Sequence, residues 1–243
     1  MKVSVIGLGK LGMPVAETMA SVHEVNGFDT NPQIKSTKVN IKSNIQDTVA
    51  DSEIIFIAVP TPHDKAYGGE LPSSNLPVRD FDYTALKKVL VELKNCVTEK
   101  QLIVNISTVL PGTLRPMIEE LELAGQFIYN PYLIAMGTVS ADFLDPDLLI
   151  VGNENGKEDD NVHKLIDFYK TLVKMEIHLQ RPFISVGTYE DAECTKIFHN
   201  TYISAKIGIA NMIQDVTHRL GNSDPDKIST ALQHADRVVG KRY

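Results

Sequence analysis

The sequence predicts an α/β protein with a Rossmann-like, doubly wound and mostly parallel sheet, followed by a long helix that opens an α-helical central domain. Three observations predict this fold class. Short apolar runs alternate with helical patterns over residues 1–187, the first run leads directly into a G-x-G-x-x-G turn, and the runs are apolar almost throughout. Continuous apolar strands, such as residues 54–59, are typical of parallel sheets that are buried on both faces.

The first expected strand, residues 2–6, ends at the turn Gly7-Leu-Gly9-Lys-Leu-Gly12. Gly7 permits the tight turn, Gly9 lets the backbone approach a pyrophosphate, and Gly12 lets the next helix pack closely on the strand. That helix is expected over residues 10–22. Its N-terminus would offer free N–H groups and the positive end of the helix dipole to phosphates.

A second strand, expected over residues 25–29, ends at Asp29. The Asp29 carboxylate would accept hydrogen bonds from a ribose diol, and its charge would repel a 2′-phosphate, so the sequence favours NAD over NADP as cofactor. The alternative is a strand-to-helix turn that needs glycine only for packing. That alternative leaves Asp29 without a role.

The remaining elements continue the alternation of strands and helices as far as residue 187, after which the pattern becomes helical. Further strands are expected over residues 53–59, 102–107, 126–129, 147–152 and 181–186, and helices over residues 84–95, 113–123 and 160–173. Residues 60–83, rich in proline and glycine, interrupt this rhythm. They are either a flexible cover over the cofactor or a mobile surface insertion, since long loops of this kind are usually functional or disordered.

Residues 189–220 contain no proline and predict one long helix, which Gly221 would end. Its apolar stripe consists of Ile209, Met212, Ile213, Val216 and Leu220. A shorter helix is expected over residues 224–234. We therefore expect a Rossmann-like NAD-binding domain over residues 1–187, the long helix and part of a helical central domain over residues 188–243, and a homodimer formed through the long helix.

Composition excludes several classes of function. The net charge of −7 over 243 residues argues against a nucleic-acid surface, and no apolar run is long enough to span a membrane. Cys96 and Cys194 show no C-x-x-C spacing, which favours a reducing compartment, and the N-terminus does not resemble a signal peptide. The sequence thus predicts a cytoplasmic protein. The histidines lack metal-ligand spacing and no G-x-S-x-G elbow is present, so we expect no metal.

Two polar residues of the long helix could carry chemistry. Lys196 and Asn200 fall on one face at helical spacing, interleaved with isoleucines. A lysine there can act as a fixed cation near a developing oxyanion, and an asparagine four residues on can orient a hydroxyl or a water. The alternative is a solvated lysine and an asparagine that bonds a neighbouring loop.

Two segments leave predicted strands in positions where a ligand would bind. Hydroxyls in residues 106–113, among them Thr108, could meet cofactor or substrate, or they could only cap the next helix. Residues 129–133 contain an Asn-Pro step, which forces an extended backbone before the proline. This second segment is either a loop that contacts substrate or a plain turn.

Together these motifs resemble the UDP-glucose/GDP-mannose dehydrogenase family over nearly the whole chain. The matching segments are Phe56-Ile-Ala-Val-Pro-Thr-Pro62, Ser107-Thr-Val-Leu-Pro-Gly-Thr113, Asn130-Pro-Tyr-Leu133 with the downstream Asp142-Phe-Leu-Asp-Pro-Asp147, Ala192-Glu-Cys-Thr-Lys-Ile-Phe-His-Asn200, and the terminal Arg237-Val-Val-Gly-Lys-Arg-Tyr243. The last of these is similar to the run that precedes the family's Gly-Phe-Gly-Gly-Ser-Cys motif.

The resemblance implies NAD-dependent oxidation of the C6 hydroxyl of a nucleotide sugar, such as UDP-glucose, to the uronate. In this family an aldehyde forms first, adds to a cysteine thiolate, is oxidised to a thioester and is then hydrolysed. Lys196 would stabilise the oxyanion, Asn200 would position a hydroxyl or a water, and Thr108 would lie near the nicotinamide. The implied cofactor contacts are Gly7, Leu8, Gly9, Lys10, Leu11, Gly12, Asp29, Val59, Thr61 and Thr108, and the implied substrate contacts are Tyr132, Leu133, Lys196 and Asn200.

The sequence departs from the family pattern in two ways that bear on the chemistry. The chain ends before the nucleophilic cysteine motif, so we expect a truncated form that binds NAD without completing the oxidation. The family's Asn-Pro-Glu glutamate is Tyr132 here, and a phenol is a far poorer base near neutral pH. Two other interpretations stay open, namely a β-hydroxyacid dehydrogenase and a non-catalytic NAD-binding or dimerisation module.

Overall fold

The computed structural model describes residues 1–70, 72, 74–135, 137–172, 182–235 and 238. The chain forms two compact units, Met1–Lys196 and Ile197–Tyr243. The first residue of the strand expected over 181–186, and the terminal run 237–243 apart from Val238, lie outside the described residues.

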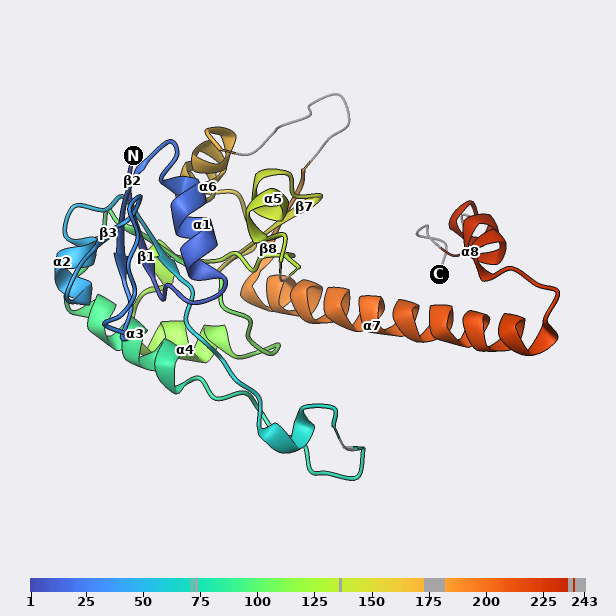
Figure 1. Cartoon of the computed structure of the whole chain (residues 1–243). Helices are drawn as coiled ribbons and strands as arrows, with labels where there is room; N and C mark the ends of the chain where they lie inside the picture. Colours follow the sequence, from blue (N-terminus) through green and yellow to red (C-terminus); the bar gives the residue numbers. More distant parts are fainter. Residues whose placement is uncertain (71, 73, 136, 173–181, 236–237, 239–243) are drawn as a thin grey trace. The chain divides into compact units, whose positions relative to one another are not determined.

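The first unit is built on one eight-stranded sheet, in the order β3-β2-β1-β4-β5-β6-β7-β8 (Figure 1). All neighbouring strands are parallel except β6 and β7, which are antiparallel. The strands are β1 Lys2–Ile6, β2 Glu24–Phe28, β3 Asn40–Ile41, β4 Ile54–Ile57, β5 Leu102–Asn105, β6 Phe127–Tyr129, β7 Leu148–Asn153 and β8 Phe183–Thr188. This arrangement confirms the predicted mostly parallel, Rossmann-like sheet, in which the strand order reverses between β1 and β4.

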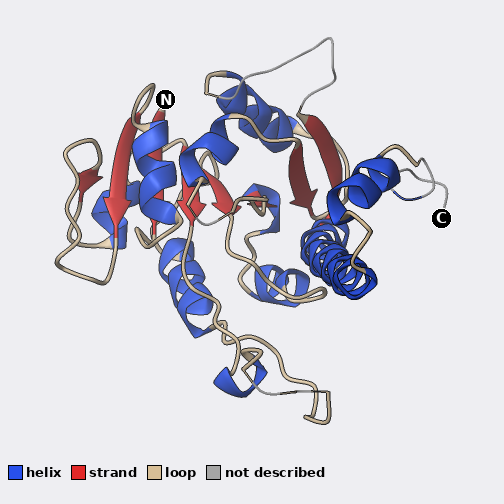
Figure 2. Ribbon diagram, turned by 45° about the vertical axis from the view of Figure 1, so that its right-hand side comes forward, coloured by secondary structure: helices blue, strands red, loops and turns tan. Residues whose placement is uncertain are grey.

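Helices cover both faces of the sheet (Figure 2). The helices of the described residues, taken over both units, are α1 Gly12–Met19, α2 Ile45–Val49, α3 Thr84–Lys94, α4 Leu114–Glu120, α5 Val139–Leu144, α6 Asp160–Lys170, α7 Tyr189–Leu220 and α8 Pro225–Gln233, with the 3₁₀ turns η1 Lys65–Tyr67 and η2 Ala124–Gln126. One core cluster unites strand residues with α1, α5 and α6, and the other unites them with α2, α3, α4 and the start of α7. The long helix predicted over residues 189–220 is present.

The alternation of side chains along each strand explains the two cores. In β4, Ile54 and Phe56 belong to the cluster under α1, α5 and α6, whereas Ile55 and Ile57 belong to the opposite cluster. All four side chains are fully buried. Successive strand residues point to opposite faces, so a strand that is apolar throughout supplies both cores at once.

Three short elements were not predicted, namely β3, α2 and α5. Each has six residues or fewer, which is too short for an apolar periodicity to be read from the sequence. The start of α2 is nevertheless marked by a cap, because the Asn44 side chain accepts a hydrogen bond from the Asp47 N–H at 2.7 Å.

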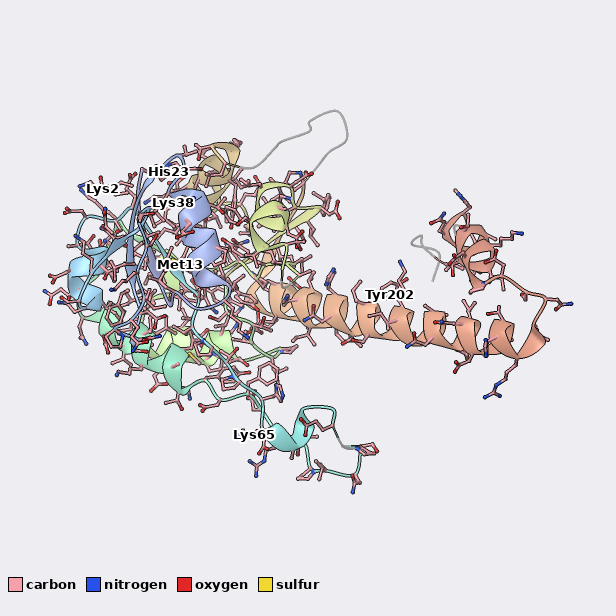
Figure 3. All side chains as sticks on the ribbon, viewed as in Figure 1. Lys2, Met13, His23, Lys38, Lys65 and Tyr202 are labelled. Carbon is pink, nitrogen blue, oxygen red and sulfur yellow. The ribbon has the colours of Figure 1, made fainter. Side chains whose placement is uncertain are left out.

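Residues 60–83 form an arm that extends away from the sheet and contains the 3₁₀ turn η1, on which Lys65 lies (Figure 3). The base of the arm is closed by a hydrogen bond of 2.8 Å from the Asp82 N–H to the Pro62 carbonyl. Further out, Arg79 pairs with Asp64 at 2.9 Å. These contacts give the arm internal structure, although the sequence predicts only an irregular segment.

The second unit contains most of α7 and the helix α8. Gly221 has a φ of +74°, which is the left-handed conformation that commonly ends a helix. Asp224 then caps α8, since its side chain accepts from the Asp226 N–H at 2.9 Å. Within the described part of the chain, no helix combines the length and the apolar character that crossing a bilayer requires.

The contact between Gly12 and the preceding turn leads to a stability prediction. A Cβ atom at Gly12 would lie 1.9 Å from the Gly7 carbonyl oxygen, whereas one at Gly9 would meet no atom within 4 Å. Gly12→Ala should therefore lower the free energy of unfolding by about 1–3 kcal/mol or more, because the backbone must shift. Gly9→Ala is the matched control and should leave the urea midpoint nearly unchanged. Equal midpoints for the two variants would contradict the packing described.

Candidate dinucleotide site and adjoining loops

The glycine turn is held between the ends of β2 and β4. The Gly7 N–H donates to the Phe28 carbonyl at 2.8 Å, and a Cβ atom at Gly7 would lie 2.6 Å from the Ala58 carbonyl oxygen. Gly7 also has a φ of +93°, which favours glycine. Gly9 and Lys10 are exposed, Leu8 and Gly12 are buried and Leu11 is half-buried. The open surface of the turn is therefore the one at Gly9.

Asp29 lies directly beside this turn. One of its carboxylate oxygens accepts from the Leu8 N–H at 2.7 Å, and the other accepts from the Asn31 N–H at 2.8 Å. These bonds fix the carboxylate while each oxygen keeps a lone pair for a further donor. An open glycine, a helix N-terminus and a fixed acid at the end of the next strand are features that suit a dinucleotide.

The loops after β4 and β5 are joined by two reciprocal hydrogen bonds. Thr61 Oγ1 donates to the Thr108 carbonyl at 2.6 Å, and Ser107 Oγ donates to the Val59 carbonyl at 2.7 Å. The structure thus brings together Val59, Thr61 and Thr108. The hydroxyl protons of Thr61 and Ser107 are engaged by the backbone, whereas the Thr108 hydroxyl has no partner among the residues that the structure describes.

Lys196 reaches the loop after β6 from the second turn of α7. Its Nζ donates to the Tyr132 carbonyl at 2.7 Å, and the residue is 8% exposed. Burial lowers the pKa of Lys196 below the usual lysine value. No carboxylate pairs with this ammonium among the described residues. Two of its three N–H donors thus remain for another oxygen.

The Tyr132 side chain turns into the core, away from the carbonyl that Lys196 binds. Its hydroxyl lies 3.0 Å from the Tyr169 hydroxyl, which also donates to the Asn130 side chain, and its ring packs against Phe143. Burial raises the pKa of Tyr132 well above that of a free phenol. Leu133 is half-buried and packs against the opposite core cluster.

Asn200 belongs to the second unit, where it is exposed. Its side-chain oxygen lies 3.5 Å from Nδ1 of the adjacent His199, and its carbonyl accepts from Ser204 Oγ at 3.1 Å. Its proposed role in orienting a hydroxyl or a water stays a prediction.

Glu193 is a residue to which sequence reasoning assigned no role. Its side chain is fully buried and accepts from the Gly112 N–H at 2.6 Å and the Leu114 N–H at 2.8 Å. Burial raises the pKa of Glu193, while these two hydrogen bonds oppose that shift. No local signal marks the contact, because it joins segments that lie far apart in the sequence.

Comparison with known proteins decides the family. The profile of the UDP-glucose/GDP-mannose dehydrogenase family, NAD binding domain, matches residues 30–173. The chain belongs to the UDP-glucose/GDP-mannose dehydrogenase family. The predicted family and its NAD cofactor are thereby confirmed, and the matched residues are the family's NAD-binding domain.

Individual relatives are distant. UDP-N-acetyl-D-mannosamine dehydrogenase of Methanococcus maripaludis is 24% identical over 254 residues, covering 96% of this chain and 55% of that protein. UDP-glucose 6-dehydrogenase of Campylobacter jejuni is 24% identical over 211 residues, covering 85% of this chain and 47% of that protein. The chain spans about half the length of the curated relatives it matches.

Solved structures confirm the fold. The crystal structure of a ternary complex of GDP-mannose dehydrogenase from Pseudomonas aeruginosa superposes with a TM-score of 0.76 at 23% identity, covering 100% of this chain and 59% of that one. At this identity the likeness concerns the fold alone.

The buried tyrosine pair predicts a loss of stability at alkaline pH. Burial raises the pKa of both Tyr132 and Tyr169, so in the folded chain these phenols keep their protons above pH 10, where an unfolded chain loses them. Their contribution to stability is full below about pH 10 and is lost as the pH rises towards the folded-state pKa values.

Tyr169→Phe should lower the free energy of unfolding near pH 8 by about 1–3 kcal/mol, because it leaves buried partners unpaired. It should also flatten the decline of stability above about pH 10. Urea unfolding between pH 8 and 11 would measure both effects. Tyr202→Phe, which alters a phenol that is 61% exposed, is the control. An unchanged alkaline slope in Tyr169→Phe would contradict this account.

Proposed function

We propose that this chain is the cofactor-binding part of an enzyme that oxidises the C6 hydroxyl of a nucleotide sugar, of the UDP-glucose kind, to the uronate with NAD. The single observation that carries the proposal is the Asp29 carboxylate bonded to the Leu8 N–H beside the open Gly9. The family membership of the chain supports the same conclusion. The names of its relatives differ in the sugar, so UDP-glucose, UDP-N-acetylmannosamine and GDP-mannose are the substrates to compare.

In this proposal NAD lies across the point where the strand order reverses, between β1 and β4. The pyrophosphate binds at residues 7–12 and the adenosine ribose binds Asp29. The nicotinamide half then falls over the ends of β4 and β5, where Val59, Thr61 and the free hydroxyl of Thr108 lie.

When bound, NAD supplies the acceptor for a hydride. The chain's own contribution is electrostatic, since Lys196 holds a desolvated ammonium with donors available to an oxygen that gains negative charge. The Tyr132 carbonyl fixes that ammonium in place. The Tyr132 phenol does not act as the base, because it is buried, bonded to Tyr169 and has a raised pKa. In the proposed reaction, Leu133 contacts the sugar, and Asn200 orients a hydroxyl or a water.

We further propose a homodimer formed through α7. Large apolar side chains of this helix are exposed within the second unit, namely Tyr202, Ile203, Ile207, Ile209, Met212, Val216 and Leu220. Exposed apolar surface of this kind commonly marks an interface. We also place the protein in the cytoplasm, where its two free thiols, Cys96 and Cys194, would stay reduced.

Two rival functions are less well supported. A β-hydroxyacid dehydrogenase would share the sheet and a lysine on the long helix, but the family match favours a nucleotide sugar. A non-catalytic NAD-binding or dimerisation module would bind NAD and no sugar. Titration with nucleotide sugars in the presence of NADH separates this module from the enzyme.

The cofactor site is tested by isothermal titration with NAD⁺ and NADP⁺. Asp29→Asn keeps the side-chain size but removes the charge, so the affinity for NAD⁺ should fall about 10-fold or more, as expected when a charged hydrogen bond is lost. The preference for NAD⁺ over NADP⁺ should shrink, since a 2′-phosphate is no longer repelled. Asp51→Asn, at an exposed position distant in sequence, is the control. Unchanged NAD⁺ affinity in Asp29→Asn would remove the basis of the proposal.

Turnover by the 243-residue chain is a separate question. We expect it to bind NAD⁺ but not to complete the four-electron oxidation of the three nucleotide sugars to uronates, because neither thiol suits the second oxidation. Cys96 donates to the Glu92 carbonyl, and burial with the nearby Glu92 charge raises the pKa of its thiol. Cys194 points about 200° around the helix from Lys196. Absorbance at 340 nm measures the rate, and steady production of a uronate would refute this expectation.

A further inference from the structure

The buried carboxylate of Glu193 joins the start of α7 to the loop that carries Thr108. Both of its oxygens are used, by the N–H groups of Gly112 and Leu114 at 2.6 and 2.8 Å. Lys196, one turn further along, bonds the loop after β6 through the Tyr132 carbonyl. Two neighbouring side chains of one helix therefore hold two strand-end loops, of which the loop after β5 carries Thr108 at the proposed nicotinamide position.

Glu193 differs from the other contacts of this loop in its charge. Among the described residues, the other hydrogen bonds between residues 109–113 and distant side chains go to the neutral phenols of Tyr83 and Tyr129. The nearby cation Arg115 is engaged by Glu190 at 2.6 Å and lies within 3.7 Å of Glu119, so it does not neutralise Glu193. A carboxylate offers one acceptor oxygen to each of the two N–H groups, whereas a glutamine of the same size would turn an NH₂ group towards one of them. The two bonds to this loop therefore depend on the carboxylate.

The Glu193 bonds lie at the far end of the Thr108 loop. The near end is fixed by Thr61 Oγ1 on the Thr108 carbonyl and by Ser107 Oγ on the Val59 carbonyl. With both ends tied, the backbone that carries Thr108 is held in place, while the Thr108 hydroxyl has no hydrogen-bond partner among the described residues. Such preorganisation is what a donor or acceptor beside a cofactor requires.

We propose that Glu193 is a positioning residue, which holds residues 112–114 against the first turns of α7 and thereby sets Thr108 against the nicotinamide half of NAD. This inference rests on the proposed cofactor site. In this proposal Glu193 does not contact the cofactor. The adenosine half, bound at the glycine turn and Asp29, depends on other elements and is not affected by Glu193.

The test compares two ligands on the full chain. NAD⁺ occupies both halves of the proposed site, whereas ADP-ribose lacks the nicotinamide. Glu193→Gln preserves volume but replaces one acceptor oxygen with an NH₂ group that faces a backbone N–H. Its affinity for NAD⁺ should fall about tenfold, while its affinity for ADP-ribose stays within about twofold of the wild type. Isothermal titration measures both affinities.

Glu190→Gln is the matched control. Glu190 also links α7 to α4, by bonds of 2.6 and 2.8 Å from Arg115, but it does not touch the Thr108 loop. This variant should leave the ratio of the two affinities at the wild-type value. Glu193→Asp is a second variant that keeps the charge and shortens the reach. It should lower NAD⁺ affinity less than Glu193→Gln if one N–H bond survives.

The outcomes are distinguishable. A selective loss of NAD⁺ affinity in Glu193→Gln supports the inference. Equal losses for NAD⁺ and ADP-ribose, or no loss for either in a folded variant, overturn it and leave the cofactor site intact. A wild-type chain that binds neither ligand instead refutes the proposed function. Should Glu193→Gln fail to fold, the comparison is made with Glu193→Asp, to which the same criteria apply.

Discussion

The parallel register of β1 with both of its neighbours is the constraint on which the site depends. Ile6, the last residue of β1, pairs with Phe28 on one side and with Ile57 on the other, so three strands end at the same level. The residues that follow them, Gly7, Asp29 and Ala58, are therefore brought together by the sheet itself. The bonds from Gly7 to Phe28 and from Leu8 to Asp29 then fix the turn in this position. The sheet register thus positions the three strand-end segments relative to one another.

The sequence was most informative where function and local geometry coincide. A glycine turn between a strand and a helix, followed by an acid at the end of the next strand, can be recognised from residues that lie close together in the sequence. The structure joins the two parts of this pattern, because the Leu8 N–H donates to Asp29. The long helix was predicted with its observed bounds, because proline is absent from it and glycine follows it. Strand ends were less well predicted: β4 ends before the apolar run 54–59 does, since the Ala58 N–H still donates to the Ile6 carbonyl but the Val59 carbonyl accepts from Ser107 in the β5 loop.

Long-range contacts could not be predicted from the sequence. The residues near Glu193 do not indicate that its carboxylate accepts from the N–H groups of Gly112 and Leu114. The residues near Tyr132 likewise do not indicate that its phenol contacts Tyr169 and that its carbonyl accepts from Lys196. Both contacts depend on which helix covers which face of the sheet. Side-chain direction within a loop is likewise a tertiary property. The Tyr132 ring, which packs in the core, is one example.

The antiparallel pairing of β6 with β7 determines where the chain can tolerate inserted residues. Because of this pairing, α7 begins alongside β6, with the Tyr189 hydroxyl on the Phe127 carbonyl, and reaches the Tyr132 carbonyl only at Lys196. A single residue inserted between these two positions would rotate every later side chain by about 100° and carry the ammonium off its acceptor. Insertions in that segment should therefore destabilise the fold. Insertions in the arm over residues 60–83 should be tolerated, because the hydrogen bond that closes the base of the arm lets its outer part change in length without moving the sheet.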